Sequence, residues 1–153
     1  MSKAKSIVIL MADDDADDRE MTRDAFEASH LVNDLRFVVN GVELMDYLHQ
    51  RGDYSDPERS PRPGIILLDL NMPKKDGREA LAEIKGDPKL AEIPVIVLTT
   101  SKEEEDIHRS YSLHANSYIT KPVTFPALVN IVAALGKYWF EIVDLPPGKR
   151  SGV

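Results

Sequence analysis

The sequence contains no cysteine at all. A chain without cysteine has no disulfide framework, no thiolate metal site and no cysteine nucleophile. A long apolar run is also missing near the start, because the stretch at residues 7–11 is long enough only for a strand, not for a signal peptide or a membrane span. Positive charge is in deficit, with a formal net charge of −7, whereas general nucleic-acid binding needs a basic face. We therefore expect a cytoplasmic protein whose partners are neither nucleic acids nor membranes.

The 153 residues are enough for one domain with a full hydrophobic core. Short apolar runs predict strands at residues 7–11, 35–39, 65–68, 95–98 and 117–120, and helical spacing or capping residues predict helices at about 17–29, 42–49 and 76–85, from 101 onward and from 125 onward. Residues 50–64 remain as a long irregular loop whose purpose the composition does not reveal. The alternation of strands and helices predicts a doubly wound α/β fold, in which helices cover both faces of a five-stranded parallel sheet.

Three of the predicted helices begin with a recognisable cap. Asp76 with Glu79, and Ser101 with Glu104, have the spacing of a capping box. Thr124 is a typical N-cap for the last helix. These caps indicate where three connections of the fold end.

The stretch Ile65–Gly77 organises the rest of the chain, because its four apolar residues run directly into the carboxylate of Asp69. Such a run predicts a strand buried on both faces, with Asp69 at its carboxyl end. The carboxyl ends of parallel strands lie at one edge of the sheet, where ligands bind in open α/β folds. That edge gathers polar residues from four strands: Asp13 and Asp14 from the first, Asp69 from the third, Thr99 from the fourth and Lys121 from the fifth.

Three carboxylates at one edge repel one another. At about 5 Å and an effective dielectric constant near 20, each pair costs roughly 3 kcal/mol, so we expect a bound cation to balance them. Ligands that are all oxygen favour Mg²⁺, with Mn²⁺ as a second possibility. Lys121 adds a fixed positive charge and Thr99 a hydroxyl group. The set predicts a place for a tetrahedral anion beside a nucleophilic carboxylate, as in an aspartyl phosphate.

Four motifs in this order resemble the receiver domains of two-component response regulators. They are Ala12-Asp13-Asp14, the stretch Asp69–Gly77, Leu98–Ser101 and Tyr118–Pro122, and the resemblance covers residues 5 to about 135. Residues 113–122 and 139–146 further resemble the single-domain regulators that serve bacterial and cyanobacterial phytochromes. The resemblance implies the flavodoxin-like, CheY-like fold with strand order 2-1-3-4-5. It also implies a phosphoryl group that arrives from a sensor histidine kinase, here a phytochrome.

The resemblance assigns a role to each residue at the predicted edge. Asp69 is the expected phosphoacceptor, and Thr99 and Lys121 are expected to bind its phosphoryl oxygens. Asp14 is expected to ligate Mg²⁺ directly and Asp13 largely through water.

Three further expectations come from the same resemblance. Asn71 is expected to offer its backbone carbonyl to the metal. Tyr118 is expected to act with Thr99 as the switch that reports phosphorylation. The family often has a cis peptide bond at this Lys-Pro pair, and the bond between Lys121 and Pro122 is chemically able to adopt it.

Other readings of these motifs fit the sequence less well. A calcium-binding EF-hand loop would need glycine at Asp18 and glutamate at Asp24. A phosphatase of the haloacid-dehalogenase type would need a second aspartate at Asn71. The remaining alternative is a constitutive protein-binding module with an unused site. We expect instead a stand-alone phosphoacceptor switch, not a turnover enzyme, with no DNA-reading output domain and a phosphotransfer protein as a possible downstream partner.

The sequence divides into a receiver domain at residues 1–135 and a C-terminal extension at residues 136–153. A helix that begins at Phe125 has two apolar stripes, and the sheet can cover only one of them. The stripe that the sheet can cover holds Phe125, Val129, Val132, Trp139 and Val143, and the second holds Ile131, Ala134, Tyr138, Ile142 and Leu145. The other stripe and the aromatic residues beyond it predict a homodimer surface. Its expected residues are Tyr138, Trp139, Phe140, Ile142 and Leu145. The alternative is that a bend at Gly136 returns both stripes to one core.

Overall fold

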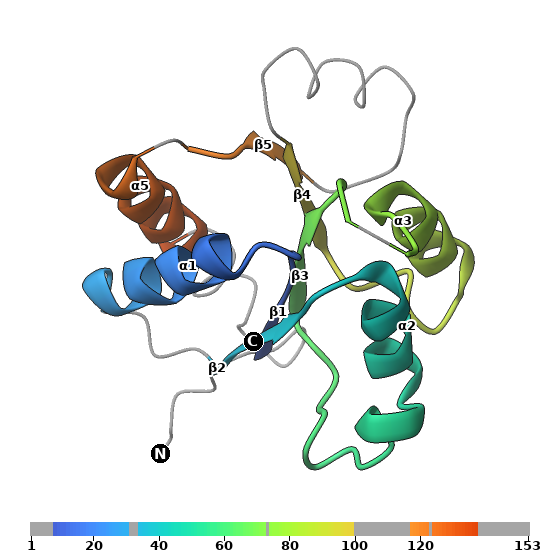
Figure 1. Cartoon of the computed structure of the whole chain (residues 1–153). Coiled ribbons are helices and arrows are strands. Elements are labelled where there is room, and N and C mark those ends of the chain that lie inside the picture. The colour runs from blue at the N-terminus through green and yellow to red at the C-terminus, as the bar shows by residue number, and fades with distance from the viewer. Residues whose placement is uncertain (1–7, 31–33, 73, 100–116, 123, 138–153) are drawn as a thin grey trace, which may run out of the picture.

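A computed structural model describes residues 8–30, 34–72, 74–99, 117–122 and 124–137. Its strands are β1 (Val8–Ala12), β2 (Asp34–Val38), β3 (Ile65–Asp69), β4 (Val95–Thr99) and β5 (Ser117–Thr120). They form a parallel sheet in the order β2-β1-β3-β4-β5 (Figure 1). The predicted fold class and strand order are therefore confirmed.

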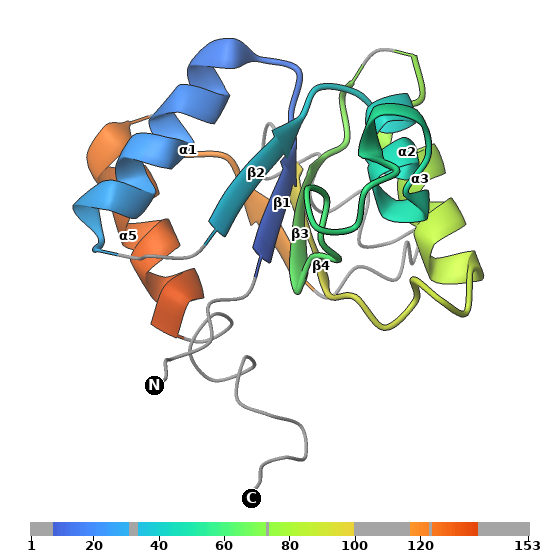
Figure 2. The same cartoon turned by 90° about the horizontal axis from the view of Figure 1, so that it is seen from below.

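Helices lie on both faces of this sheet. They are α1 (Ala16–Ala28), α2 (Gly41–His49), α3 (Gly77–Gly86) and α5 (Phe125–Leu135), with a short 3-10 turn η1 at Gly52–Tyr54. Helices α1 and α5 cover one face and α2 and α3 the other (Figure 2). The helix predicted from Ser101 onward lies outside the described residues. None of the described helices has both the length and the apolar character needed to cross a membrane.

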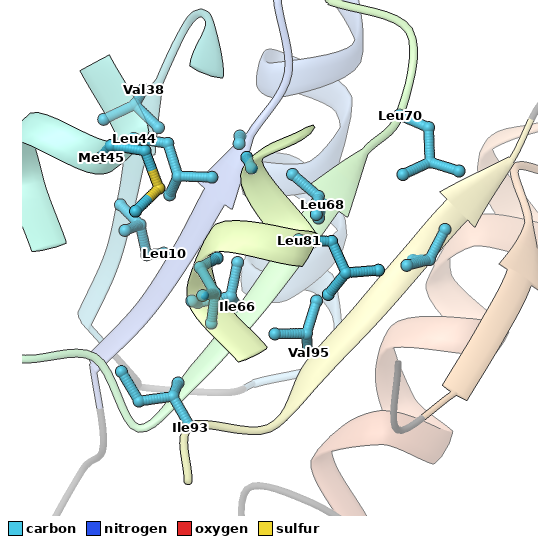
Figure 3. Packing of buried hydrophobic residues seen from close by; sticks show 14 of the residues in the cluster. Leu10, Val38, Leu44, Met45, Ile66, Leu68, Leu70, Leu81, Ile93 and Val95 are labelled. Atoms are coloured by element: carbon cyan, nitrogen blue, oxygen red, sulfur yellow. The ribbon is translucent and has the colours of Figure 1, made fainter. Parts of the chain in front are cut away.

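Alternate residues of the inner strands supply two separate cores. In β1, Ile9 and Met11 pack toward α1 and α5, whereas Leu10 packs toward α2 and α3. β3 follows the same alternation, so its even-numbered Ile66 and Leu68 lie under α3 (Figure 3). Every residue of β3 is buried, as predicted for a strand covered on both faces.

The helix starts follow the expected capping chemistry, with one shift. Asp76 and Glu79 form the predicted capping box of α3, and the Thr124 hydroxyl accepts from the first turn of α5. The helix predicted from about residue 17 begins one residue earlier, at Ala16. Its N-cap is Asp15, whose carboxylate accepts from the backbone N–H groups of Asp17 and Asp18.

One predicted contact of α5 is wrong. Phe125, which we expected the sheet to cover, is 39% exposed. The reason is that residues 124–126 are exposed as a group, and the helix packs on the sheet only from Leu128 onward. Val132 is buried as predicted.

Two glycines allow helix starts to lie against the loop that follows β3. A Cβ atom on Gly77 would lie 2.5 Å from the Cα of Leu70, and one on Gly41 would lie 2.0 Å from the backbone oxygen of Lys75. Neither contact is sterically possible, so both positions exclude a side chain. The loop that carries Asp69 is thus enclosed by backbone on two sides.

The long loop at residues 50–64 is held by side chains from its neighbours. Arg36 donates to the carbonyl of Arg59, Gln50 donates to the carbonyl of Ser60 at 3.2 Å, and the Tyr47 hydroxyl donates to the carbonyl of Pro61 at 2.8 Å. Three consecutive carbonyls are therefore bonded to β2 and to the end of α2. The segment is an ordered part of the fold, which its composition did not reveal.

Candidate functional site

The strand register brings the predicted residues to one edge of the sheet. Ala12 pairs with Leu68, so Asp13 lies beside Asp69, and Thr99 at the end of β4 pairs with Thr120. Asp13 and Asp69 continue the odd-numbered positions of their strands and therefore lie on the side of α1 and α5.

The centre of the site is the ammonium group of Lys121. Its Nζ atom lies 2.8 Å from Asp18 Oδ2, 3.0 Å from Asp13 Oδ2 and 3.1 Å from Asp69 Oδ2. An ammonium group has three N–H donors, and each has a carboxylate acceptor here. Burial alone lowers the pKa of Lys121, but the hydrogen bonds to Asp18 and Asp13 outweigh this effect and raise the pKa above its ordinary value.

The negative charges of the two buried carboxylates, Asp13 and Asp69, are not fully balanced by Lys121. The Asp13 side chain is fully buried, and Asp69 is 4% exposed. Burial raises the pKa of Asp13 to about 6, although the backbone N–H of Asp15 and the Lys121 ammonium both oppose the shift. Burial also raises the pKa of Asp69, against the N–H of Asn71 and against Lys121. Both carboxylates would therefore gain from a further cation.

Asp13, Asp14 and Asp69 fit a divalent cation. Each offers a carboxylate oxygen, and these oxygens all lie within 4.8 Å of one another. Asp14 is exposed, so one side of the cluster is open to water, as Mg²⁺ requires to keep several of its own waters. The donor set is all oxygen, which favours Mg²⁺ or Mn²⁺ over zinc.

Lys121 is the fixed positive charge that the sequence predicts at this edge. The chain thus carries its own cation in contact with two of the three carboxylates. A bound divalent cation then adds to this compensation and is not its only source.

The remaining predicted site residues occupy different positions. Asn71 is exposed, and its N–H donates to Asp69 Oδ1 at 2.9 Å. Thr99 is the last residue of β4, at the expected edge, and its side chain lies outside the described part of the chain. Tyr118 is buried in the core on the side of α2 and α3.

The cis peptide bond considered for Lys121–Pro122 is not present. No cis bond occurs among the described residues, so this bond is trans. The trans isomer is the lower in energy for an X–Pro bond by about 0.5–1 kcal/mol.

Asp18 is the site residue that sequence reasoning did not include. It lies in the first turn of α1, three residues after the N-cap Asp15. The only signal for it in the sequence is its place among acidic residues that suit a helix N-terminus. Asp18 and Lys121 are 103 positions apart in the sequence, so no local pattern predicts their contact.

Comparisons with known proteins agree with this geometry. The family model for the response regulator receiver domain matches residues 9–133. Response regulator Rcp1 of Synechocystis is 45% identical over 139 residues, which are 91% of this chain and 92% of that protein.

Solved structures give the same result. The crystal structure of the phosphorylated cyanobacterial phytochrome response regulator RcpA is 43% identical, with a TM-score of 0.80, over 90% of this chain and 96% of that chain. The Mn²⁺-bound form of Rcp1 is 45% identical, with a TM-score of 0.78, over 92% of this chain and 99% of that chain. The oxygen-ligand cluster and these matches support the predicted Mg²⁺ cofactor. This chain therefore belongs to the response regulator receiver domain family.

Proposed function

We propose that Asp69 accepts a phosphoryl group from a phosphohistidine of a sensor kinase. The observation that carries this proposal is the position of Asp69, which lies 3.1 Å from the partly buried Lys121 ammonium group and within 4.8 Å of carboxylate oxygens of Asp13 and Asp14. In the transfer, a bond forms between a carboxylate oxygen of Asp69 and phosphorus while the P–N bond to the histidine breaks. The imidazole leaves with the electron pair and takes up a proton.

The chain contributes charge and position to this transfer. Phosphoryl transfer has a loose transition state, so its catalysis depends mainly on positioning and on charge stabilisation. Mg²⁺, when held by Asp13, Asp14, Asp69 and the backbone carbonyl of Asn71, supplies positive charge beside the phosphoryl oxygens. Lys121 supplies a second positive charge, 3.1 Å from Asp69 Oδ2, and Thr99 supplies a hydroxyl donor. According to this proposal, the protein is a switch that is modified once per signal and is not a turnover enzyme.

The test is phosphorylation by a small donor, acetyl phosphate with Mg²⁺, followed by mass spectrometry. The wild-type protein should gain the mass of one phosphoryl group, and hydroxylamine should remove it, because acyl phosphates react with hydroxylamine. Asp69→Asn keeps the shape of the side chain but removes the nucleophile, so it should gain nothing. A variant that labels at the wild-type rate would overturn the assignment, and a wild-type protein that never labels would favour the constitutive binding module.

Thr99 and Tyr118 form the proposed switch. A phosphoryl group beside Thr99 adds strong hydrogen-bond acceptors, which should draw the end of β4 inward and change the packing of the Tyr118 ring. Thr99→Ala should still accept phosphate, but its Tyr118 ring signals in NMR should change little on phosphorylation. Full ring signal changes in this variant would remove Thr99 from the switch.

The proposed phosphodonor is a phytochrome kinase, supported by the phytochrome response regulators among the similar structures. The test compares phosphotransfer from a phosphorylated phytochrome kinase and from a histidine kinase of another sensor class. We expect transfer from the phytochrome to be at least about tenfold faster, equivalent to about 1.4 kcal/mol of discrimination. Equal rates would leave the receiver function in place and refute the pairing.

The proposed assembly is a homodimer through the C-terminal extension. The support is the run of apolar and aromatic residues that the sequence carries beyond residue 137, in excess of the one covered stripe that a surface helix needs. The residues proposed for the interface, Tyr138, Trp139, Phe140, Ile142 and Leu145, lie outside the described part of the chain.

Light scattering tests the dimer directly. Trp139→Ala combined with Ile142→Ala should convert a dimer into a monomer, whereas Lys137→Ala, at an exposed neighbouring position, should leave the dimer intact. A wild-type protein that is a monomer at tens of micromolar would refute this part of the proposal. The cytoplasmic location predicted from the sequence stays a prediction.

A further inference from the structure

Asp18 has the shortest of the three contacts to Lys121, although it is the only one of the three carboxylates outside the proposed metal cluster. Its Oδ2 lies 2.8 Å from Nζ, and its side chain is 36% exposed at the start of α1. The other two partners, Asp13 and Asp69, belong to the set that fits a divalent cation. Lys121 is therefore shared between the reactive cluster and one residue on a different element.

Metal binding and phosphorylation should affect the three contacts of Lys121 differently. Phosphorylation converts one carboxylate oxygen of Asp69 into an ester-like oxygen, and a divalent cation engages Asp13, so both become weaker acceptors for Lys121. Asp18 has no such competitor. It is the one acceptor that can keep hold of the ammonium group while the other two N–H donors turn to the phosphoryl oxygens.

Asp18 is also well placed to hold the lysine still. Its backbone N–H is capped by Asp15, and its carbonyl accepts from the Thr22 hydroxyl at 2.8 Å, so its position on α1 is set by two local hydrogen bonds. Lysine has a long, flexible side chain, and fixing it before the reaction removes an entropy cost from the transfer step.

We propose that Asp18 is a positioning residue, which holds the Lys121 ammonium group in place for the phosphoryl group on Asp69. This role rests on the proposed phosphoacceptor function and adds a residue to it. Asp18 touches neither the phosphoryl group nor the metal, and acts only through Lys121.

Simple charge effects predict the opposite result, which makes the role testable. Asp18 is an anion near a site that receives an anion, so on charge alone its removal should help an anionic phosphodonor to react. A positioning role predicts that its removal slows the reaction. The sign of the change therefore separates the two explanations.

Asp17 provides a matched control. It is the neighbouring acidic residue in the same first turn of α1, it is exposed, and it has no contact with Lys121. Asp17→Asn and Asp18→Asn remove the same charge from the same helix end. A difference between them reports the contact with Lys121, because their effect on the helix dipole is similar.

The experiment measures the rate of phosphorylation of the full chain by acetyl phosphate at saturating Mg²⁺. In this reaction an Asp69 oxygen bonds to phosphorus, the bond from phosphorus to the acetate oxygen breaks, and acetate leaves with the electron pair. Asp18→Asn should be slowed about three- to tenfold, whereas Asp17→Asn should be unchanged or slightly faster. Asp18→Glu keeps the charge and can still reach Nζ, so it should recover at least half of the lost rate.

The outcomes are distinct. If Asp18→Asn labels as fast as Asp17→Asn, the positioning role is wrong while the receiver function stands. If Asp18→Glu is as slow as Asp18→Asn, although both variants melt within a few degrees of wild type, the carboxylate does not act by holding Lys121, and the role is again wrong. If the wild-type protein itself does not label, the failure lies in the proposed function and not in Asp18.

Discussion

The two faces of the central sheet use the same strands for different purposes. Even-numbered residues of β1 and β3 lie in a core with α2 and α3, and this row continues beyond β3 with the buried apolar Leu70 and Met72. Odd-numbered residues lie under α1 and α5, and their row ends with the carboxylates Asp13 and Asp69. A cavity of about 50 Å³ also lies on this second side, between α1 and α5, with Lys121 and Asp18 in its wall.

The difference between the two faces shows how a small domain can hold buried carboxylates and remain stable. Among the described residues, the larger of the two buried apolar clusters lies on the side of α2 and α3, so we expect this side to contribute more of the favourable burial. The side of α1 and α5 carries two buried carboxylates with raised pKa values, which cost stability. We therefore expect substitutions on the two sides to separate stability from chemistry.

The largest effect on stability should come from the side of α2 and α3. Leu81 of α3 is completely buried, so Leu81→Ala should lower the free energy of unfolding by about 3 kcal/mol, as measured by urea denaturation. Leu128→Ala on α5 is the matched control, because Leu128 is only partly buried and borders the cavity, and it should cost about 1 kcal/mol. Equal costs would mean that the two faces are equally well packed.

Removal of the metal-binding charge should come next. At a free Mg²⁺ concentration of 100 times its Kd, the wild-type protein should gain about 2.7 kcal/mol of stability over its value in EDTA. Asp14→Asn should lose most of this gain, but in EDTA it should be at least as stable as wild type, because Asp14 no longer repels Asp69. Asp17→Asn should keep the full Mg²⁺ response. A variant at Asp14 that is weaker in EDTA and still responds to Mg²⁺ would show that the proposed ligand set is wrong.

The pH dependence of stability in EDTA should be somewhat smaller. The pKa of Asp13 is about 6 in the folded protein and near the ordinary 3.8 of an aspartate in the unfolded chain, so the folded state binds more protons between these values. Stability should therefore fall as pH rises from about 4 to 6, by about 2 kcal/mol, and Asp69 contributes in the same direction. Thermal unfolding across this range checks the slope, and Asp13→Asn should flatten it. Stability that rises over this interval would contradict the assigned burial cost.

The smallest effect concerns the loop beside α2. Tyr47→Phe removes the hydroxyl that donates to the carbonyl of Pro61, so the free energy of unfolding should fall by about 1 kcal/mol. Tyr54→Phe is a control for the exchange measurement below, since the side chains described as donors to the carbonyls of residues 59–61 are those of Arg36, Gln50 and Tyr47. Hydrogen exchange should increase at the backbone amides of Arg59 and Ser60 in the first variant only. An unchanged exchange pattern would mean that the loop is held by other contacts.

Local patterns explain which features were predictable from the sequence. The run of Ile65–Asp69 and the pair Asp76 and Glu79 are each read within a few neighbouring residues, and both are as predicted. The gathering of Asp13 with Asp69 needed one further rule, that parallel strands end at a common edge.

The features that were not predictable depend on contacts between distant segments. Asp18 reaches Lys121 only because the first turn of α1 lies beside the end of β5, and an acidic residue at a helix start already has a sufficient local explanation. The order of residues 50–64 is similar, because the groups that hold the loop come from β2 and α2. The exposure of Phe125 depends on where α5 first meets the sheet, which helical spacing alone does not give.

The two glycines at the helix starts set a condition for transplanting this site into another protein. A host scaffold needs more than the acidic and basic side chains, since it must also offer two helix starts without a Cβ atom, at the equivalents of Gly41 and Gly77. With alanine at the first position, the backbone of Lys75 would have to retreat from a contact of 2.0 Å, and the loop that begins at Asp69 would retreat with it. A protein engineer should therefore copy the empty space around the acceptor loop together with its charges.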